Sequence, residues 1–206
     1  MEYNIFYSFC TFVFISSITP GPNNLMLATS SLNFGFYRTI PQILGIIFGF
    51  FIIITLCFFG IEIISIIYPK LLLILTFFSV IFLTYIIYRI LIFEFKNSNT
   101  TSKPFSFLEG LSFQLINPKG IFVIISSITT FSDITNYNIL NYILLTTVFL
   151  ISTFISTCIW SLFGKIISIY FTNEKYFKLF KYSMASTMFI CLIIILIYKK
   201  NQLILI

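Results

Sequence analysis

Residues 40–60 read IPQILGIIFGFFIIITLCFFG, a run of 21 residues without a charged side chain. About 20 mostly apolar residues are enough for a helix to cross the hydrocarbon core of a bilayer, so this run predicts a transmembrane helix. Five more segments have the same character. Together the six are Ile5–Leu27, Ile40–Gly60, Leu71–Phe93, Phe105–Phe131, Ile139–Gly164 and Leu179–Tyr198. Their short connections leave no room for a separate soluble domain.

The composition agrees with a membrane protein. Hydrophobic residues make up 59% of the 206 residues and charged residues only 9%, whereas an average soluble domain has roughly 25% charged residues. The net charge of +6 would suggest a nucleic-acid partner in a soluble protein. Here the basic residues lie between the apolar segments, so we expect no nucleic acid. The sequence predicts one all-α polytopic membrane domain over 1–206, with about six transmembrane helices in a lipid bilayer.

The basic residues also predict an orientation. Eight belong to the first, third and fifth connections and three to the other side. The eight are Arg38, Arg89, Lys96, Lys103, Lys165, Lys175, Lys178 and Lys181, and the three are Lys70, Lys199 and Lys200. Cytoplasmic loops are enriched in Lys and Arg. The odd-numbered connections are therefore expected in the cytoplasm and both termini outside.

Two predicted spans contain residues that interrupt a helix. Residues 19–24 read TPGPNN in the first span, and residues 117–120 read NPKG in the fourth. Proline removes a backbone donor and clashes with the preceding turn. Unpaired backbone groups cost several kcal/mol in hydrocarbon, so broken helices are tolerated where protein or a water-filled cavity surrounds them. We expect helices 1 and 4 to be broken and both breaks to face inward.

The positions of the breaks suggest an internal repeat. If the chain divides near Lys103 into repeats of about 1–103 and 104–206, each repeat has three spans and begins with a broken one. An odd number of spans per repeat inverts the second repeat in the membrane. Interrupted helices in corresponding places of two inverted repeats are the usual indication of a transporter binding site.

The breaks supply candidate binding groups. A half-helix that begins after Pro22 would direct backbone N–H groups and a positive dipole end toward a bound anion, such as an amino-acid carboxylate. The carbonyls before Pro20 and Pro118, with the side chains of three asparagines, could accept hydrogen bonds from the ammonium group. The predicted substrate-binding residues are Pro20, Gly21, Pro22, Asn23, Asn24, Asn117, Pro118 and Lys119.

Lys119 has two interpretations. A charge at the centre of a spanning helix costs about 3 kcal/mol on insertion scales, and intramembrane lysines are usually functional. The alternative is a structural cation that reaches the interface or caps a broken helix. Glu62 and Asp133 could carry a coupled proton only if they turn inward, because they lie near span ends, as does Glu109.

Other chemistry has little support. The chain has no His, and its four cysteines stand alone in apolar runs at positions 10, 57, 158 and 191. We therefore expect no metal site, no cofactor and no enzyme activity. Gly45-x-x-x-Gly49 permits close helix approach, which fits packing within the monomer or a homodimer face.

These motifs together resemble the LysE-type exporter family. The matching residues are Thr19-Pro20-Gly21-Pro22-Asn23-Asn24, Asn33-Phe34-Gly35-Phe36-x-Arg38 and Gly45-x-x-x-Gly49 in the first half. In the second half they are Pro104-x-x-Phe107 and Phe113-Gln114-x-x-Asn117-Pro118-Lys119. The homoserine and threonine exporter (RhtB-like) branch is the most similar, and Thr157-Cys158-x-Trp160 is similar to members that export cysteine and O-acetylserine.

The resemblance implies a secondary exporter of amino acids in the bacterial cytoplasmic membrane, driven by the proton gradient, with its site on helices 1 and 4. Small neutral substrates such as threonine, homoserine, cysteine or O-acetylserine are expected. Alternating access around a midplane site is the expected mechanism. A channel or a non-transporting membrane subunit remains the alternative, and a membrane enzyme is disfavoured by the scattered titratable residues.

Overall fold

The computed structural model describes residues 3–92, 103–131, 139–170, 175–176, 178–187, 189–190 and 193, at some helical positions by the backbone alone. The regular secondary structure of these residues is helical, as predicted. The helices are α1 (Tyr3–Ile18), α2 (Pro22–Phe34), α3 (Phe36–Leu91), α4 (Phe107–Ile116), α5 (Pro118–Phe131) and α6 (Ile139–Tyr170).

The predicted breaks in helices 1 and 4 are confirmed. The axis bends by 51° between α1 and α2 and by 58° between α4 and α5. In the searched part of the chain, Phe36–Gly60 and Ile139–Ile167 are long and apolar enough to cross a membrane, and each bent pair is a further candidate span. The described residues thus give up to four spans.

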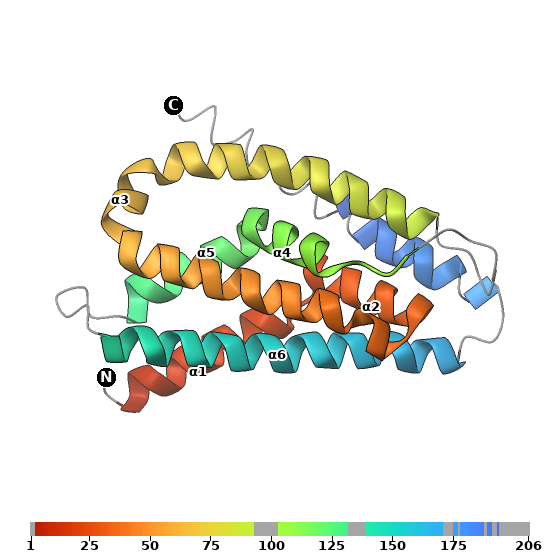
Figure 1. Ribbon diagram of the computed structural model, residues 1–206, viewed down its shortest axis with the longest axis horizontal. Helices are drawn as coiled ribbons and strands as arrows, with labels where there is room; N and C mark the ends of the chain where they lie inside the picture. The colour runs from red at the N-terminus through yellow and green to blue at the C-terminus, as the bar shows by residue number, and fades with distance from the viewer. Residues whose placement is uncertain are drawn as a thin grey trace.

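The prediction of a loop for the second connection is wrong. A loop was expected between Gly60 and Leu71, but α3 is helical without interruption from Phe36 to Leu91. Residues 61–70 are mostly apolar and contain no glycine, which is compatible with a continued helix, although Pro69 disfavours it. The helix itself doubles back at the left of Figure 1. Its second limb holds most of the predicted span Leu71–Phe93, and Leu179–Tyr198 is only partly within the described residues.

The helix ends gather at two ends of the molecule. The α2–α3 junction at Gly35, the end of α3 and the end of α6 lie at one end, which we call the Gly35 end (Figure 1). The starts of α1 and α6 and the end of α5 lie at the opposite end. The pair α1–α2 therefore crosses the molecule in the direction opposite to α4–α5. This agrees with the predicted order of connections, while the inverted repeat itself stays a prediction.

Glycines allow the close approach of neighbouring helices. A Cβ at Gly45 would overlap the carbonyl oxygen of Phe107 in α4, and one at Gly49 would press on the Gln114 side chain. Gly164 of α6 is equally close to the backbone of Ala28 in α2. The motif Gly45-x-x-x-Gly49 thus packs within the chain, as the first of its two interpretations predicted, so it gives no support to a homodimer face.

Candidate functional site

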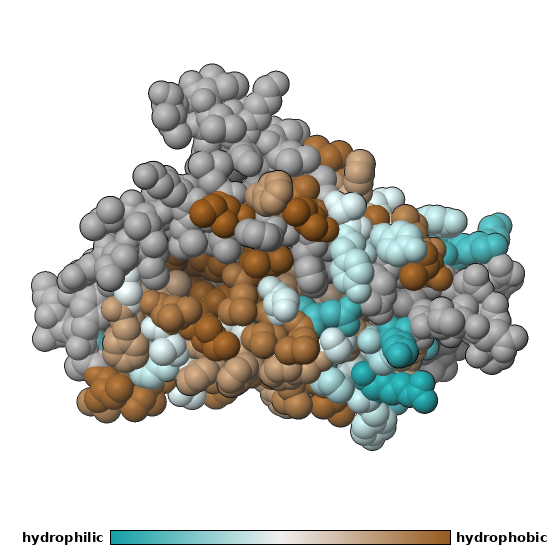
Figure 2. All heavy atoms as spheres, turned by 45° about the horizontal axis from the view of Figure 1, so that its top comes forward, coloured by the Kyte–Doolittle hydropathy of each residue, from teal (hydrophilic) through white to brown (hydrophobic). Residues whose placement is uncertain are grey.

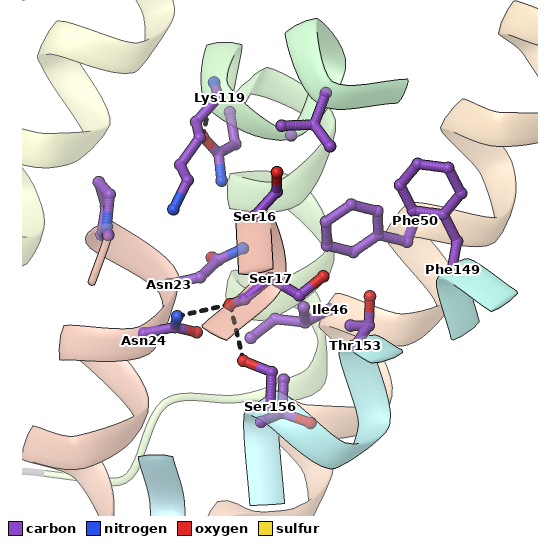
Figure 3. A pocket seen from close by; sticks show the side chains of 16 residues that line it. Ser16, Ser17, Asn23, Asn24, Ile46, Phe50, Lys119, Phe149, Thr153 and Ser156 are labelled. Carbon is purple, nitrogen blue, oxygen red and sulfur yellow. Dashed lines mark hydrogen bonds between the residues drawn. The ribbon is translucent and has the colours of Figure 1, made fainter. Parts of the chain in front are cut away.

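The two helix breaks lie against each other at a cavity (Figure 3). They face inward only in part, as Asn23, Asn24 and Asn117 are buried whereas Thr19 and Pro20 are exposed. The Nζ atom of Lys119, near the start of α5, donates to the carbonyl oxygen of Thr19 over 3.1 Å and to its Oγ1 over 3.0 Å. The Nδ2 atom of Asn23 in α2 donates to Oε1 of Gln114 in α4. Segments separated by about a hundred residues in the sequence are therefore joined at this point.

The carbonyl groups at the end of α1 determine several of these contacts. The last carbonyls of a helix have no partner in the helix itself. The Ser17 carbonyl accepts from Asn24 Nδ2 at 2.9 Å and from Ser156 Oγ at 2.7 Å, and the Ile18 carbonyl accepts from Trp160 Nε1 at 3.0 Å. Together with Lys119, side chains from α2, α5 and α6 thus hold the end of α1. A lysine ammonium also suits the negative end of the helix dipole.

The neighbouring helix starts differ in how they are capped. α2 begins at Pro22 after Gly21, and no side chain caps its first turn. α5 begins at Pro118, and the Asn117 Oδ1 atom accepts from the Lys119 backbone N–H at 3.1 Å. The start of α2 therefore has positive dipole character, and unlike the start of α5 it has no side-chain acceptor.

A cavity of about 50 Å³ lies at this junction. Since a water needs roughly 10–15 Å³ by this measure, the cavity has room for only a small ligand. Its hydroxyl groups come from Ser16, Ser17, Thr153, Ser156 and Thr157. Its apolar walls come from Ile46, Phe50, Val123 and Phe149. Among its described lining residues, Lys119 is the one charged side chain.

Six of the eight predicted binding residues line this cavity. They are Gly21, Pro22, Asn23, Asn24, Asn117 and Lys119, with Gly120 beside them. Pro20 and Pro118 are not among the lining residues. Both prolines lie at the breaks, so they shape the backbone that presents the other six.

Both backbone carbonyls that were expected to accept from an ammonium group already have partners within the protein. The Thr19 carbonyl, before Pro20, already accepts from Lys119 and from Asn24 Nδ2, and the Asn117 carbonyl, before Pro118, accepts from the Ile121 N–H. Within the described part of the chain, Asn23 Oδ1 and Thr153 Oγ1 have no hydrogen-bonding partner. These two residues are only 9% and 3% exposed, so both are buried acceptors at the cavity.

Sequence reasoning missed the contribution of α6. Thr153, Ser156 and Thr157 line the cavity, and Trp160 holds α1. The available signal was their spacing of three or four residues, which places them on one face of a helix. Hydroxyl groups in an apolar segment are common, so that signal alone does not separate a binding face from ordinary packing.

The predicted acidic residues are not part of the described cavity. Glu109 forms a capping box with Ser106 at the start of α4 and accepts from Tyr85 Oη at 2.8 Å. The side chain of Glu62 and the whole of Asp133 lie outside the described residues. Among the residues searched, no group of three or more His, Cys, Asp or Glu side chains could hold a metal ion.

The chain is similar in sequence to known membrane translocators. The model of the family described as "LysE type translocator" matches residues 14–200. The chain is 28% identical over 125 residues to cysteine/O-acetylserine efflux proteins of Escherichia coli O157:H7, Escherichia coli strain K12 and Shigella flexneri serotype 5b. The matched region spans 60% of this chain and 64% of the length of each relative. No solved structure matches significantly. Because the family match covers most of the chain, this protein belongs to the LysE type translocator family.

Proposed function

We propose that this protein is a secondary transporter that exports small neutral amino acids or their derivatives across the bacterial cytoplasmic membrane. The observation that carries the proposal is the cavity between the two helix breaks, with its single lysine and its unpaired buried acceptors. Family membership supports transport as the activity. The name of the relatives, cysteine/O-acetylserine efflux protein, supports small amino acids and export as the direction.

The cavity offers complementary groups for an amino-acid zwitterion. A carboxylate would bind the Lys119 ammonium and the uncapped first turn of α2, because both carry positive charge. An ammonium would donate to Asn23 Oδ1 and Thr153 Oγ1, the two buried acceptors of the described cavity lining that lack protein partners. The amino acid would thereby satisfy polar groups whose burial otherwise costs free energy.

The same chemistry disfavours basic amino acids. A lysine or arginine substrate brings a second positive charge, and the described cavity lining contains no carboxylate to pair with it. The Lys119 ammonium would repel that charge in surroundings of low dielectric constant. The small cavity volume acts in the same direction by excluding long side chains.

In the proposed mechanism the binding site alternates between the two sides of the membrane. The broken pairs α1–α2 and α4–α5 meet at the cavity, so a relative movement of the two halves would open it first to one side and then to the other. Coupling to the proton gradient, which the family resemblance implies, is part of the proposal.

The test is amino-acid efflux from cells that express the parent protein, Thr153→Val or Thr29→Val at equal membrane abundance. Thr153→Val removes an unpaired hydroxyl from the cavity. Thr29 is buried outside the cavity and donates to the Leu25 carbonyl within its own helix at 2.8 Å, so Thr29→Val is the matched control. The substrates are cysteine, O-acetylserine, threonine and homoserine, with lysine for comparison.

We expect the parent to accelerate efflux of one or more neutral amino acids and not of lysine. Loss of one neutral hydrogen bond is worth about 1 kcal/mol, so Thr153→Val should raise the apparent KM about fivefold, while Thr29→Val leaves it unchanged. If the parent accelerates no amino acid, the proposed function is wrong. If lysine is the preferred substrate, the argument from cavity charge fails.

A further inference from the structure

Several buried polar side chains lie outside the cavity lining and are not part of the binding site described above. In the described part of the chain, six residues outside the cavity lining have side-chain N or O atoms without a hydrogen-bonding partner. One is Gln114, whose Oε1 accepts from Asn23. The other five are Ser31, Gln42, Ser127, Thr146 and Ser161. Four of these residues are 0% exposed and Thr146 is 6% exposed. Buried polar groups are normally paired, so this concentration in one small protein requires an explanation.

The first part of the explanation comes from α3 and α5. Gln42 precedes the cavity residues Ile46 and Phe50 at intervals of four residues along α3. Ser127 follows Gly120 and Val123, which line the cavity from α5, at helical spacing. Residues three or four apart lie on the same face of a helix. Both unpaired side chains therefore belong to the face that borders the cavity.

The same relation holds for α2 and α6. Ser31 lies seven residues, or about two turns, beyond the cavity residue Asn24. On α6, Thr146 precedes Thr153 by seven residues and Ser161 follows it by eight. The five side chains thus extend the cavity faces of all four helices and are not scattered over unrelated faces.

The five side chains also separate along the length of the molecule. Ser31, Gln42 and Ser161 lie on the parts of their helices toward the Gly35 end (Figure 1). Ser127 and Thr146 lie toward the opposite end, near the end of α5 and the start of α6. Thr146 and Ser161 are fifteen residues apart, or about 22 Å along the helix. That distance is most of the roughly 30 Å hydrocarbon thickness.

We propose that these residues line the two closed halves of the translocation route, one on each side of the cavity. Ser31, Gln42 and Ser161 form the half toward the Gly35 end, and Ser127 and Thr146 form the other half. This proposal rests on the proposed transport function, and it assigns the path to residues that lie outside the cavity. Hydroxyl and amide groups can donate to a carboxylate and accept from an ammonium, so they would replace water around a passing zwitterion without trapping it by charge.

The route predicts water access from opposite sides of the membrane. Single cysteines are placed at Ser161 and Thr146 in a parent whose four native cysteines have been replaced, and Thr29→Cys is the buried control. Gln42→Cys and Ser127→Cys are second variants for the two halves, in case one of the first pair does not fold. Each is treated with a small charged methanethiosulfonate in right-side-out and in inside-out vesicles.

We expect the Ser161→Cys variant to react from the side that the Gly35 end faces, and the Thr146→Cys variant from the other side. Both should react about tenfold faster than the Thr29→Cys variant, because thiol modification needs an accessible thiolate. Equal rates in the control and in both halves would overturn the proposal. Reaction of both halves from the same side would overturn it as well.

This readout is independent of the substrate. Two-sided labelling in a protein that accelerates no amino-acid efflux would retain the route and refute the proposed function. Efflux of neutral amino acids by a protein whose five positions are as unreactive as the control would retain the function and refute the route.

Discussion

The carbonyl groups at the end of α1 explain why particular side chains occur on distant helices. Trp160 of α6 donates to the Ile18 carbonyl, and Ser156 and Asn24 donate to the Ser17 carbonyl. Such donors are needed wherever a helix stops inside the apolar region. The break at Pro20 therefore has consequences for residues far away in the sequence.

This requirement can be tested at Trp160. Trp160→Phe keeps an aromatic ring but removes the donor, so the Ile18 carbonyl loses this hydrogen bond. An unsatisfied buried acceptor costs about 1–3 kcal/mol, and we expect a lower melting temperature of the purified protein in detergent. Phe163→Leu, which alters the ring packed against Trp160 without removing a donor, is the control. Equal melting temperatures for Trp160→Phe and the parent would contradict this role.

Lys119 should be more important for export than for folding. Lys119→Met removes both hydrogen bonds to Thr19 and the positive charge at the cavity. Hydrogen bonds to charged groups are worth about 1.5–3 kcal/mol, so we expect an apparent KM raised roughly ten- to a hundredfold. Thr19→Val, which keeps the carbonyl acceptor, should have a smaller effect. The measurement is amino-acid efflux beside the melting temperature, and unchanged efflux in Lys119→Met would exclude a binding role.

At the scale of helices, the contact between α3 and α4 depends on small residues. Gly45→Ala places a methyl group against the Phe107 carbonyl, which is backbone and cannot rotate away. Overpacking of this kind costs about 1–3 kcal/mol, so the melting temperature should fall. Leu44→Ala changes the neighbouring residue, which is exposed on the outer face, and should lower the melting temperature less. A Gly45→Ala protein as stable as the parent would show that the helices separate easily.

The helix breaks could be predicted because proline acts through its own covalent structure. Residues 19–24 and 117–120 interrupt their helices in the structure as the sequence indicated. The residues that α6 contributes could not be predicted in the same way, since Thr153 and Ser156 matter only through the face that turns inward. The continuous helix through 61–70 was also missed, because two charged residues and a proline suggest a loop but do not force one.

At the scale of the whole molecule, polar and apolar surfaces are segregated along its length. Hydrophilic residues gather toward the Gly35 end on the face shown in Figure 2, and apolar residues cover the middle. The apolar surface includes exposed side chains of α3 and α6, among them Phe48, Leu56 and Phe154. This pattern fits a protein with lipid around its middle and water or headgroups at the Gly35 end.

The orientation in the membrane is predicted by charge and can be measured at two exposed positions. Tyr37 is 80% exposed near the Gly35 end, and Leu140 is 70% exposed at the start of α6. The excess of basic residues in the odd-numbered connections predicts that the Gly35 end faces the cytoplasm. In the parent without native cysteines, a membrane-impermeant maleimide added to intact cells should label the Leu140→Cys variant and leave the Tyr37→Cys variant unmodified until the membrane is opened.

The reverse labelling pattern would place the Gly35 end outside and the start of α1 in the cytoplasm. It would also reassign Ser31, Gln42 and Ser161 to the outer half of the proposed route, while the contacts between the two helix breaks would be unaffected. Orientation and site geometry are therefore separate properties of this protein. The direction of transport depends on neither alone, because a carrier moves its substrate down the combined gradient to which it is coupled.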